Sequence, residues 1–194
     1  AGVRVPKPYD FLDGVLLMEL VADEHGDAAP RLNDVHLEPE QAREYHAFII
    51  RQIVLMLCAG LVHGDLSEFN VLLGPDGPVI IDLPQAVDAA ANNHAFSMLD
   101  RDVANMAAYF GRFAPELKDT RYAREMWSIY QAGELQADTP LTGQWKDDEH
   151  HADVHGVMRE IEAARFDEER RKAAKADAER GPVKGEEPPP PWLQ

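Results

Sequence analysis

A helical pattern over residues 39–59 limits the possible folds more than any other segment, because its second half is apolar on nearly every side. Pro39 with Glu40 in the first turn marks the start of the helix, and Gly60 marks its end. The apolar positions of the second half are Phe48, Ile49, Ile50, Ile53, Val54, Leu55 and Leu57. A helix with so little polar surface is stable only in a core, so the other elements have to pack around it.

Short strands are expected on both sides of this helix. Residues 3–11 and 14–21 indicate two strands joined at Leu12-Asp13-Gly14, since Asp-Gly is a strong hairpin signal. Residues 61–73 and 79–83 indicate two buried strands around a turn that contains two glycines and a proline. Short hairpins beside a buried helix predict an α+β fold.

Further helices are expected in the second half of the chain. Apolar residues at helical spacing predict a helix over about residues 93–113, which Pro115 ends. A third helix is expected over about residues 121–132, and a fourth over about residues 153–180. The proline-rich residues 181–194 are predicted to form a disordered tail.

Composition narrows the classes of function. A chain of 194 residues that is 45% hydrophobic can bury one core, and it has no apolar run long enough to span a bilayer. The formal net charge of −16 repels phosphate backbones, which argues against direct nucleic-acid binding by this chain. The single cysteine, Cys58, excludes an internal disulfide and indicates a cytoplasmic protein. Its apolar neighbours predict a small buried side chain.

Three polar residues carry the candidate chemistry. Asp65 and Asn70 fit the spacing D-x-x-x-x-N within residues 61–73, and Asp82 ends the apolar strand that follows. The predicted hairpin brings Asp82 back beside Asn70, although the two residues are separated in sequence. His63 is expected to support this loop through hydrogen bonds rather than act as an acid or base.

Phosphoryl transfer from ATP requires groups of this kind. One carboxylate orients the proton of the attacking hydroxyl or water, and two oxygen ligands hold Mg²⁺ against the phosphates. An Asp-Asn pair alone usually reflects turn chemistry, and a strand-end aspartate alone is usually a cap. Here helix, loop, turn and strand occur in the order and spacing of a kinase, which favours a catalytic interpretation.

Longer motifs around these residues resemble the Rio kinases, an atypical family of serine protein kinases. Residues 63–70, His-Gly-Asp-Leu-Ser-Glu-Phe-Asn, resemble the catalytic loop of that family. Residues 81–85, Ile-Asp-Leu-Pro-Gln, resemble its metal-binding I-D-x-[SP]-Q motif. Residues 29–35 resemble the loop after its hinge, and residues 100–105 resemble the helix after its metal loop. The similarity covers about residues 3–113.

The resemblance implies a protein-kinase-like fold. It would consist of a mainly helical C-lobe with short β-hairpins, together with the last strands and hinge of the N-lobe. Residues 1–21 would be the end of the N-lobe and the hinge, and residues 22–180 the C-lobe with its C-terminal helix. The family's phosphate-binding loop, strand lysine and partner glutamate precede the hinge. We therefore expect them upstream of Ala1 and expect this fragment alone to be weakly active or inactive.

The resemblance also implies a role for each candidate site residue. Asp65 would be the catalytic aspartate, while Asn70 and Asp82 would hold the magnesium ion. Some family members act as ATPases with a transient phosphate on the aspartate that matches Asp82, which would make Asp82 catalytic as well. The substrates would be ATP and an unidentified protein serine, with the protein itself as one candidate.

Nucleotide-binding residues follow from the same resemblance. Residues 18–21 resemble the hinge, so backbone groups of Glu19 and Val21 would bind adenine and Met18 would be the gatekeeper beside it. Leu72 and Ile81 would form apolar walls under the base.

Two other functions compete with this one. A small-molecule kinase of the aminoglycoside-phosphotransferase type shares H-G-D-x-x-x-x-N, but Glu68-Phe69 and Leu83-Pro84-Gln85 differ from the residues usual in that class. A non-catalytic scaffold fragment is disfavoured because all three polar groups are retained. Separately, His150, His151 and His155 offer ligands for a transition metal, although a solvated helix start explains them more simply.

Overall fold

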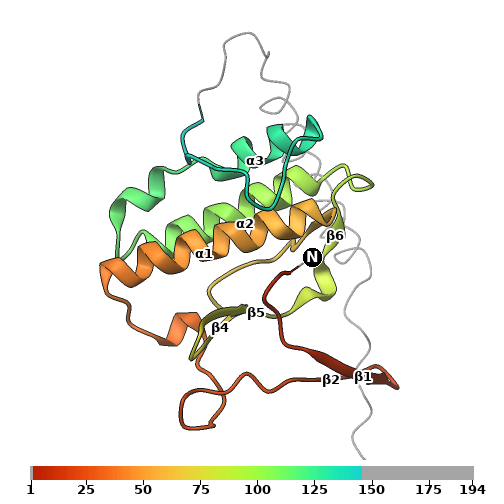
Figure 1. Cartoon of the computed structure of the whole chain (residues 1–194), viewed down its shortest axis with the longest axis vertical. Helices are drawn as coiled ribbons and strands as arrows, with labels where there is room; N and C mark the ends of the chain where they lie inside the picture. Colours follow the sequence, from red (N-terminus) through yellow and green to blue (C-terminus); the bar gives the residue numbers. More distant parts are fainter. Residues whose placement is uncertain (1, 146–194) are drawn as a thin grey trace, which may run out of the picture. The chain divides into compact units, whose positions relative to one another are not determined.

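A computed structural model of the chain describes residues 2–145. The helix expected over residues 153–180, the tail 181–194 and the histidines at 150, 151 and 155 lie outside the described residues. The described part is an α+β structure with three α-helices and small antiparallel sheets (Figure 1). In chain order its elements are β1 (Pro8–Leu12), β2 (Val15–Met18), η1 (Leu32–Asp34), α1 (Pro39–Cys58), β3 (Leu61–Val62), β4 (Val71–Gly74), β5 (Gly77–Ile80), η2 (Leu83–Gln85), β6 (Val87–Asp88), α2 (Ala95–Phe110), η3 (Pro115–Asp119) and α3 (Tyr122–Gln131).

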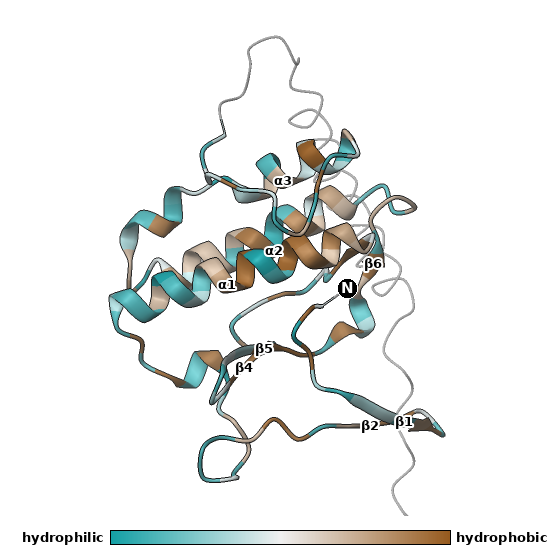
Figure 2. Ribbon diagram, viewed as in Figure 1, coloured by the Kyte–Doolittle hydropathy of each residue, from teal (hydrophilic) through white to brown (hydrophobic). Residues whose placement is uncertain are grey.

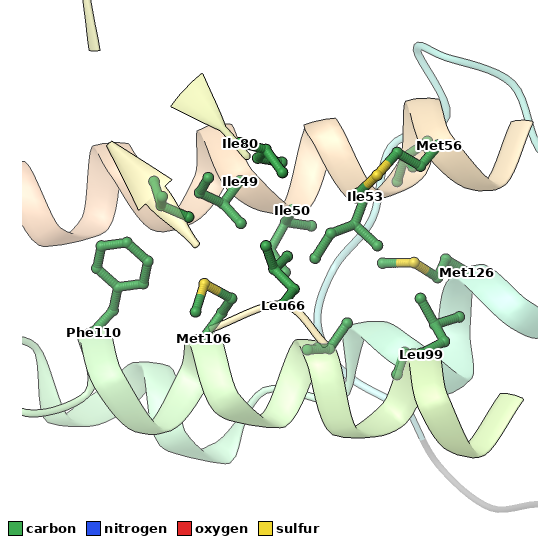
Figure 3. Close-up of a cluster of buried hydrophobic side chains, with 14 of the residues drawn as sticks. Ile49, Ile50, Ile53, Met56, Leu66, Ile80, Leu99, Met106, Phe110 and Met126 are labelled. Carbon is green, nitrogen blue, oxygen red and sulfur yellow. The ribbon is translucent and has the colours of Figure 1, made fainter. Parts of the chain in front are cut away.

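The core forms where α1 packs against α2. Hydrophobic residues are concentrated in the C-terminal half of α1 and along α2 (Figure 2). Ile49 and Ile53 of α1 point towards Met106 and Leu99 of α2, and Leu66 from the β3–β4 loop lies between the two helices (Figure 3). The predicted burial of the second half of this helix is confirmed, with Phe48 and Leu55 as half-buried exceptions.

Local sequence signals explain where the helices begin and end. A capping box formed by Glu38 and Gln41 precedes α1, so the start predicted at Pro39 is confirmed. α2 is three residues shorter at its C-terminal end than predicted, because Gly111 caps it and the following turn leads into η3. Cys58 is exposed in the last turn of α1, so the prediction of a buried side chain was wrong. Within residues 2–145 no helix is both long and apolar enough to cross a membrane.

The N-terminal segment runs against α1 and β5 before it reaches the first hairpin. The amide N of Arg4 donates to Oε1 of Gln52 at 2.7 Å, and its carbonyl oxygen accepts from the amide N of Ile80 at 3.0 Å. The hairpin then pairs β1 with β2 around Asp13-Gly14, both at positive φ, as its Asp-Gly signal predicts. Every residue of the two strands is exposed.

The strand predicted over residues 61–73 is not continuous. Only Leu61–Val62 and Val71–Gly74 are strands, and they belong to different sheets: β3 pairs with β6, and β4 pairs with β5. An irregular loop separates them because its backbone groups bond to α2 instead of to a neighbouring strand. The candidate residues Asp65 and Asn70 lie in this loop.

His46 is a buried histidine in the middle of the core. Its side chain is 2% exposed, it contacts the rings of Phe110 and Tyr122, and its Nε2 has no hydrogen-bond partner within residues 2–145. Burial lowers the pKa of His46 from its ordinary value of 6.5 to about 4. The folded protein therefore holds the neutral imidazole at pH values where the unfolded chain already binds a proton.

We expect the free energy of unfolding to fall as the pH decreases from 6.5 to about 4, by up to about 3 kcal/mol from this residue. Urea denaturation at a series of pH values measures it. His46→Leu cannot take up a proton and should flatten the profile in this window. His36→Leu, at an exposed histidine, serves as the control for replacing a histidine by leucine. A slope that persists in His46→Leu would assign the effect to other groups.

Candidate functional site

The loop between β3 and β4 presents Asp65 from a fixed backbone. Gly64 has φ 84°, and a Cβ atom at this position would lie 3.1 Å from the carbonyl oxygen of Gln85. A larger residue would therefore be strained by its φ angle and crowded by the segment after Asp82. Asp65 itself is partly buried, with its amide N 3.4 Å from Nδ1 of His63.

Side chains from α2 hold the backbone on both sides of Asp65. The carboxylate of Asp102 accepts from the amide N of Gly64 and from the amide N of Leu66, both at 2.8 Å. Arg101 donates to the carbonyl oxygen of Gly64, and Nδ2 of Asn105 donates to the carbonyl oxygen of Leu66 at 3.0 Å. The two residues that flank Asp65 are thus fixed through both their N–H and their C=O groups.

Asp102 is 1% exposed, which is unusual for a residue with an ionisable carboxyl group. Burial raises the pKa of Asp102, while the hydrogen bonds from Leu66 and Gly64 and the nearby His63 and Arg101 act in the opposite direction. The raised pKa shows that desolvation is the largest of these effects. The donors that face the carboxylate are what make its burial tolerable.

The β4–β5 hairpin brings Asp82 near the loop that carries Asp65 and Asn70. Val71 pairs with Ile80, and the amide N of Ile81 donates to the carbonyl oxygen of Asn70 at 3.0 Å, so Asp82 follows a residue that is bonded directly to Asn70. The ring of His63 reaches the same strand, with Nε2 3.0 Å from the carbonyl oxygen of Ile81. This contact agrees with the supporting role expected for His63.

Asn70 and Gln85 turn their side chains towards Asp65. Nδ2 of Asn70 donates to the carbonyl oxygen of Asp65 at 2.8 Å, which leaves the amide oxygen of Asn70 as the atom available to a cation. Nε2 of Gln85 lies 3.4 Å from Oδ2 of Asp65. Asp82 is exposed and has φ 65°, so its backbone adopts the left-handed conformation that non-glycine residues seldom take.

The segment expected to bind adenine offers two free backbone groups. The amide N of Glu19 donates to the carbonyl oxygen of Lys7 at 2.8 Å, and the carbonyl oxygen of Val21 accepts from the amide N of Ala29 at 2.9 Å. The carbonyl oxygen of Glu19 and the N–H of Val21 make no hydrogen bond within residues 2–145.

The expected apolar contacts are less closely defined. Met18 is 46% exposed at the end of β2, and Leu72 and Ile81 are partly buried. A Cβ atom at Gly74 would lie 3.4 Å from Cγ1 of Val21, so the end of β4 approaches the segment after β2. Leu72 and Val21 therefore belong to neighbouring parts of the structure, and the same strand that carries Leu72 leads from Asn70.

The roles of Asp102, Gln85, Arg101 and Asn105 were not predicted from the sequence. A signal for Asp102 was present, because this aspartate lies at helical spacing from Leu99 and Met106 in the apolar stripe of α2. A charged residue at such a position needs buried partners. The residues that supply them lie 36 and 38 positions away in sequence, which no local pattern indicates.

The arrangement can bind a hard cation together with phosphate oxygens. Within residues 2–145 no three His, Cys, Asp or Glu side chains gather into a metal cluster of their own. The accessible oxygens of Asp82 and Asn70 fit Mg²⁺, which proteins commonly hold through one or two side chains, with phosphates and waters as the other ligands. A clamped loop that carries an aspartate, followed by a hairpin with a second aspartate just beyond it, is consistent with the kinase-like class of α+β domains.

Comparison with known proteins gives the family. The family model described as the RIO domain matches residues 1–123, and the chain belongs to this family. A RIO-type serine/threonine-protein kinase Rio1 of Haloferax volcanii is 46% identical over 114 residues, which cover 58% of this chain and 37% of that protein. A RIO-type serine/threonine-protein kinase Rio2 of Methanocaldococcus jannaschii is 33% identical over 121 residues, covering 61% of this chain and 43% of that protein.

A further relative, the serine/threonine-protein kinase rio1 of Schizosaccharomyces pombe, is 33% identical over 115 residues, 58% of this chain and 22% of that protein. The chain spans less than half the length of these curated relatives. All three are named as Rio kinases, which supports the Rio resemblance over the small-molecule kinase and the scaffold.

Asp102→Asn should destabilise the protein by about 2–4 kcal/mol, because the amide keeps one acceptor for two buried N–H donors and points its own NH₂ group at one of them. Chemical denaturation measures the loss. Hydrogen exchange at the amides of Gly64 and Leu66 should accelerate in the variant. Asp100→Asn, on the same helix, is the matched control and should change neither quantity. Unchanged exchange at Gly64 and Leu66 would show that Asp102 does not hold the loop.

Proposed function

We propose that residues 2–145 carry the catalytic and metal-binding part of an ATP-dependent serine kinase of the RIO type. One observation supports this above the others: a loop fixed from α2 presents Asp65 beside a hairpin that delivers Asp82 next to Asn70. If Asp65 and Asn70 only stabilised a turn, the loop would not need to be held by side chains of α2. If Asp82 only capped a strand, it would not need a second carboxylate nearby. In this proposal residues 1–21 are the end of the N-lobe and the hinge, residues 22–180 the C-lobe, and residues 181–194 a tail.

Asp65 is the proposed catalytic residue. Its carboxylate accepts the hydrogen bond of the attacking serine hydroxyl and orients the oxygen towards the γ-phosphorus of ATP. The new O–P bond forms as the bond to the β–γ bridging oxygen breaks, ADP leaves, and the hydroxyl proton passes to Asp65. The contact between Gln85 and Oδ2 of Asp65 supports this role, because it limits the rotation of the carboxylate.

Asn70 and Asp82 are the proposed metal ligands. When bound, Mg²⁺ would neutralise charge on the phosphate oxygens. The exposed carboxylate of Asp82 and the amide oxygen of Asn70 are the accessible donors, and the bond from Asn70 to the backbone of Asp65 ties the metal ligand to the catalytic residue. An ATPase cycle is the alternative use of the same site, in which the carboxylate of Asp82 accepts the phosphoryl group before water releases it.

Adenine recognition is proposed for the segment after β2. The carbonyl oxygen of Glu19 and the N–H of Val21 match the donor and acceptor that lie side by side on the edge of adenine. Met18 at the end of β2 is the proposed gatekeeper, and Leu72 and Ile81 the apolar surface under the base. The approach of β4 to Val21 supports this grouping, since it brings Leu72 near the segment.

The protein substrate is proposed to be a serine, either in another protein or in this one. Within the chain, self-modification has few acceptors, because its only serines are Ser67, Ser97 and Ser128. Ser97 and Ser128 are exposed, whereas Ser67 lies partly buried in the catalytic loop itself. Ser97 and Ser128 are therefore the candidate sites of autophosphorylation in this part of the protein.

Asp65→Asn should reduce phosphoryl transfer by about 10²- to 10⁴-fold and leave the Kd for Mg·ATP nearly unchanged, because the amide cannot accept the proton. Transfer of labelled γ-phosphate and calorimetric titration of the intact protein measure the two quantities. Asp138→Asn, at an exposed aspartate outside the site, is the charge-matched control and should behave as the parent protein. Full activity in Asp65→Asn would refute the proposed role.

Asp82→Asn should raise the Kd for ATP in the presence of magnesium by at least about tenfold, because it removes the negative ligand. The Kd measured in EDTA should not change, so the dependence of binding on magnesium becomes smaller. Calorimetry with and without the metal tests this. If Asp65→Asn rather than Asp82→Asn abolished the magnesium dependence, the two roles would have to be exchanged.

A further inference from the structure

The positive charges of this acidic protein are unevenly distributed. Within residues 2–145 the lysines and arginines are Arg4, Lys7, Arg31, Arg43, Arg51, Arg101, Arg112, Lys118, Arg121 and Arg124. The last four line a single cleft between α2, η3 and the start of α3. The chain as a whole carries a net charge of −16, so this cleft is a positively charged region in a protein that is negatively charged overall.

Small residues make room for a ligand in this cleft. Ala104, Ala107 and Ala108 of α2 and Ala123 of α3 line it, and its volume is about 660 Å³. A volume of this size is within the range of small-molecule and peptide side-chain pockets. The aliphatic stem of Lys118 lies across Gly111, where an added Cβ atom would clash with its Cγ. Packing of this stem on Gly111, rather than an ion pair, therefore positions the ammonium group of Lys118 beside the cleft.

The cations of the cleft are only partly neutralised by the protein. Asp100 is the one acidic residue in its lining, and Arg112 lies 3.0 Å from Oε1 of Glu68. Lys118 and Arg121 are exposed, and neither side chain forms an ion pair within residues 2–145. Lys118 and Arg121 thus give the cleft two positive charges that no acidic side chain of residues 2–145 pairs with.

The N-terminus of α3 borders the cleft, and its first turn also carries Glu125, whose buried carboxylate accepts from the amide N of Gly143 at 2.8 Å. α3 has ten residues, begins at Tyr122 and has no side-chain cap at its N-terminus. Ala123, in its first turn, lines the cleft. The first turn of a helix presents unbonded N–H groups and a partial positive charge, which favour an anion. Arginine guanidinium groups bind the oxygens of a phosphoryl group through two parallel hydrogen bonds.

We propose that this cleft binds the phosphoryl group of a phosphorylated serine or threonine in a polypeptide. A dianionic phosphate matches the excess of cations, and the alanine-lined floor suits the aliphatic part of a peptide. A nucleic acid is a poorer match, because the net charge of −16 on the chain repels a continuous run of phosphates.

The cleft is connected to the loop that carries Asp65. Arg112 lines the cleft and bonds to Glu68, which lies between Asp65 and Asn70 in the loop. A phosphate in the cleft competes with Glu68 for the guanidinium group of Arg112. Binding is therefore expected to increase the mobility of the loop at Glu68, which hydrogen exchange can follow.

Fluorescence anisotropy with a labelled pentapeptide, Ala-Ala-phosphoserine-Ala-Ala, tests the site in the intact protein. The unphosphorylated peptide is the first control, and inorganic phosphate should displace the phosphopeptide. Lys118→Gln with Arg121→Gln should raise the Kd at least about tenfold, because two charged donors are lost. Arg51→Gln, at an exposed arginine on α1 outside the cleft, should leave the Kd unchanged. Binding is measured without ATP, so the result does not depend on the proposed kinase activity.

Several outcomes would overturn the proposal. These are equal binding of the phosphorylated and unphosphorylated peptides, an equal loss in Arg51→Gln, and tighter binding of an RNA oligonucleotide through Lys118 and Arg121. Both substituted residues are exposed, and thermal unfolding checks that the variant folds. The single variant Arg121→Gln provides a second test if the double variant does not, and an unchanged Kd in it would also count against the site.

Discussion

The carboxylate of Asp102, buried between the amide N–H groups of Gly64 and Leu66, fixes the part of the structure on which the rest of the site depends. Burying a carboxylate opposes folding, as the raised pKa of Asp102 shows, and the two backbone donors with Arg101 and His63 offset that cost. These hydrogen bonds hold the backbone of the loop in an irregular conformation and prevent it from forming a regular strand. The position of Asp65 therefore follows from a contact made by its neighbours rather than from any contact of its own side chain.

The β4–β5 hairpin supplies the other half of the geometry. Its register pairs Val71 with Ile80, so the residue before β4 and the residues after β5 meet at the open end of the hairpin. Asp82 then leaves the strand at φ 65°, a conformation that costs free energy for a residue with a Cβ atom. Because the hydrogen bond between Ile81 and Asn70 and the contact of His63 with Ile81 fix the residue before it, this conformation is maintained. The backbone up to Ile81 is thus fixed directly before Asp82.

The main elements were predictable because their signals are local. The apolar second half of α1 has few alternatives to a core position, and Asp13-Gly14 specifies a hairpin turn by its own conformational preference. The interruption of the strand between Val62 and Val71 was not predictable, because it results from bonds to Asp102 and Asn105, residues that lie on a later helix. The spacing of Asp65 and Asn70 identified the loop, whereas the side chains that hold it were missed. The exposure of Cys58 was missed for a related reason: its neighbours in sequence are apolar, but Cys58 lies on the exposed side of the last turn of α1, where Met56 and Leu57 are buried.

α2 connects the two functional regions proposed here. One side of the helix carries Asp102 and Asn105, which hold the loop, and another carries Ala104, Ala107 and Ala108, which line the basic cleft. Arg112, two residues beyond the end of the helix, reaches Glu68 in the loop and also borders the cleft. An anion in the cleft competes with Glu68 for Arg112. By thermodynamic linkage, any state of the loop that strengthens the ion pair between Arg112 and Glu68 therefore weakens the binding of the anion. The free energy of this coupling cannot exceed that of the ion pair. The pair is weak because the side chain of Arg112 is largely exposed, so an anion in the cleft changes the mobility of the loop only modestly.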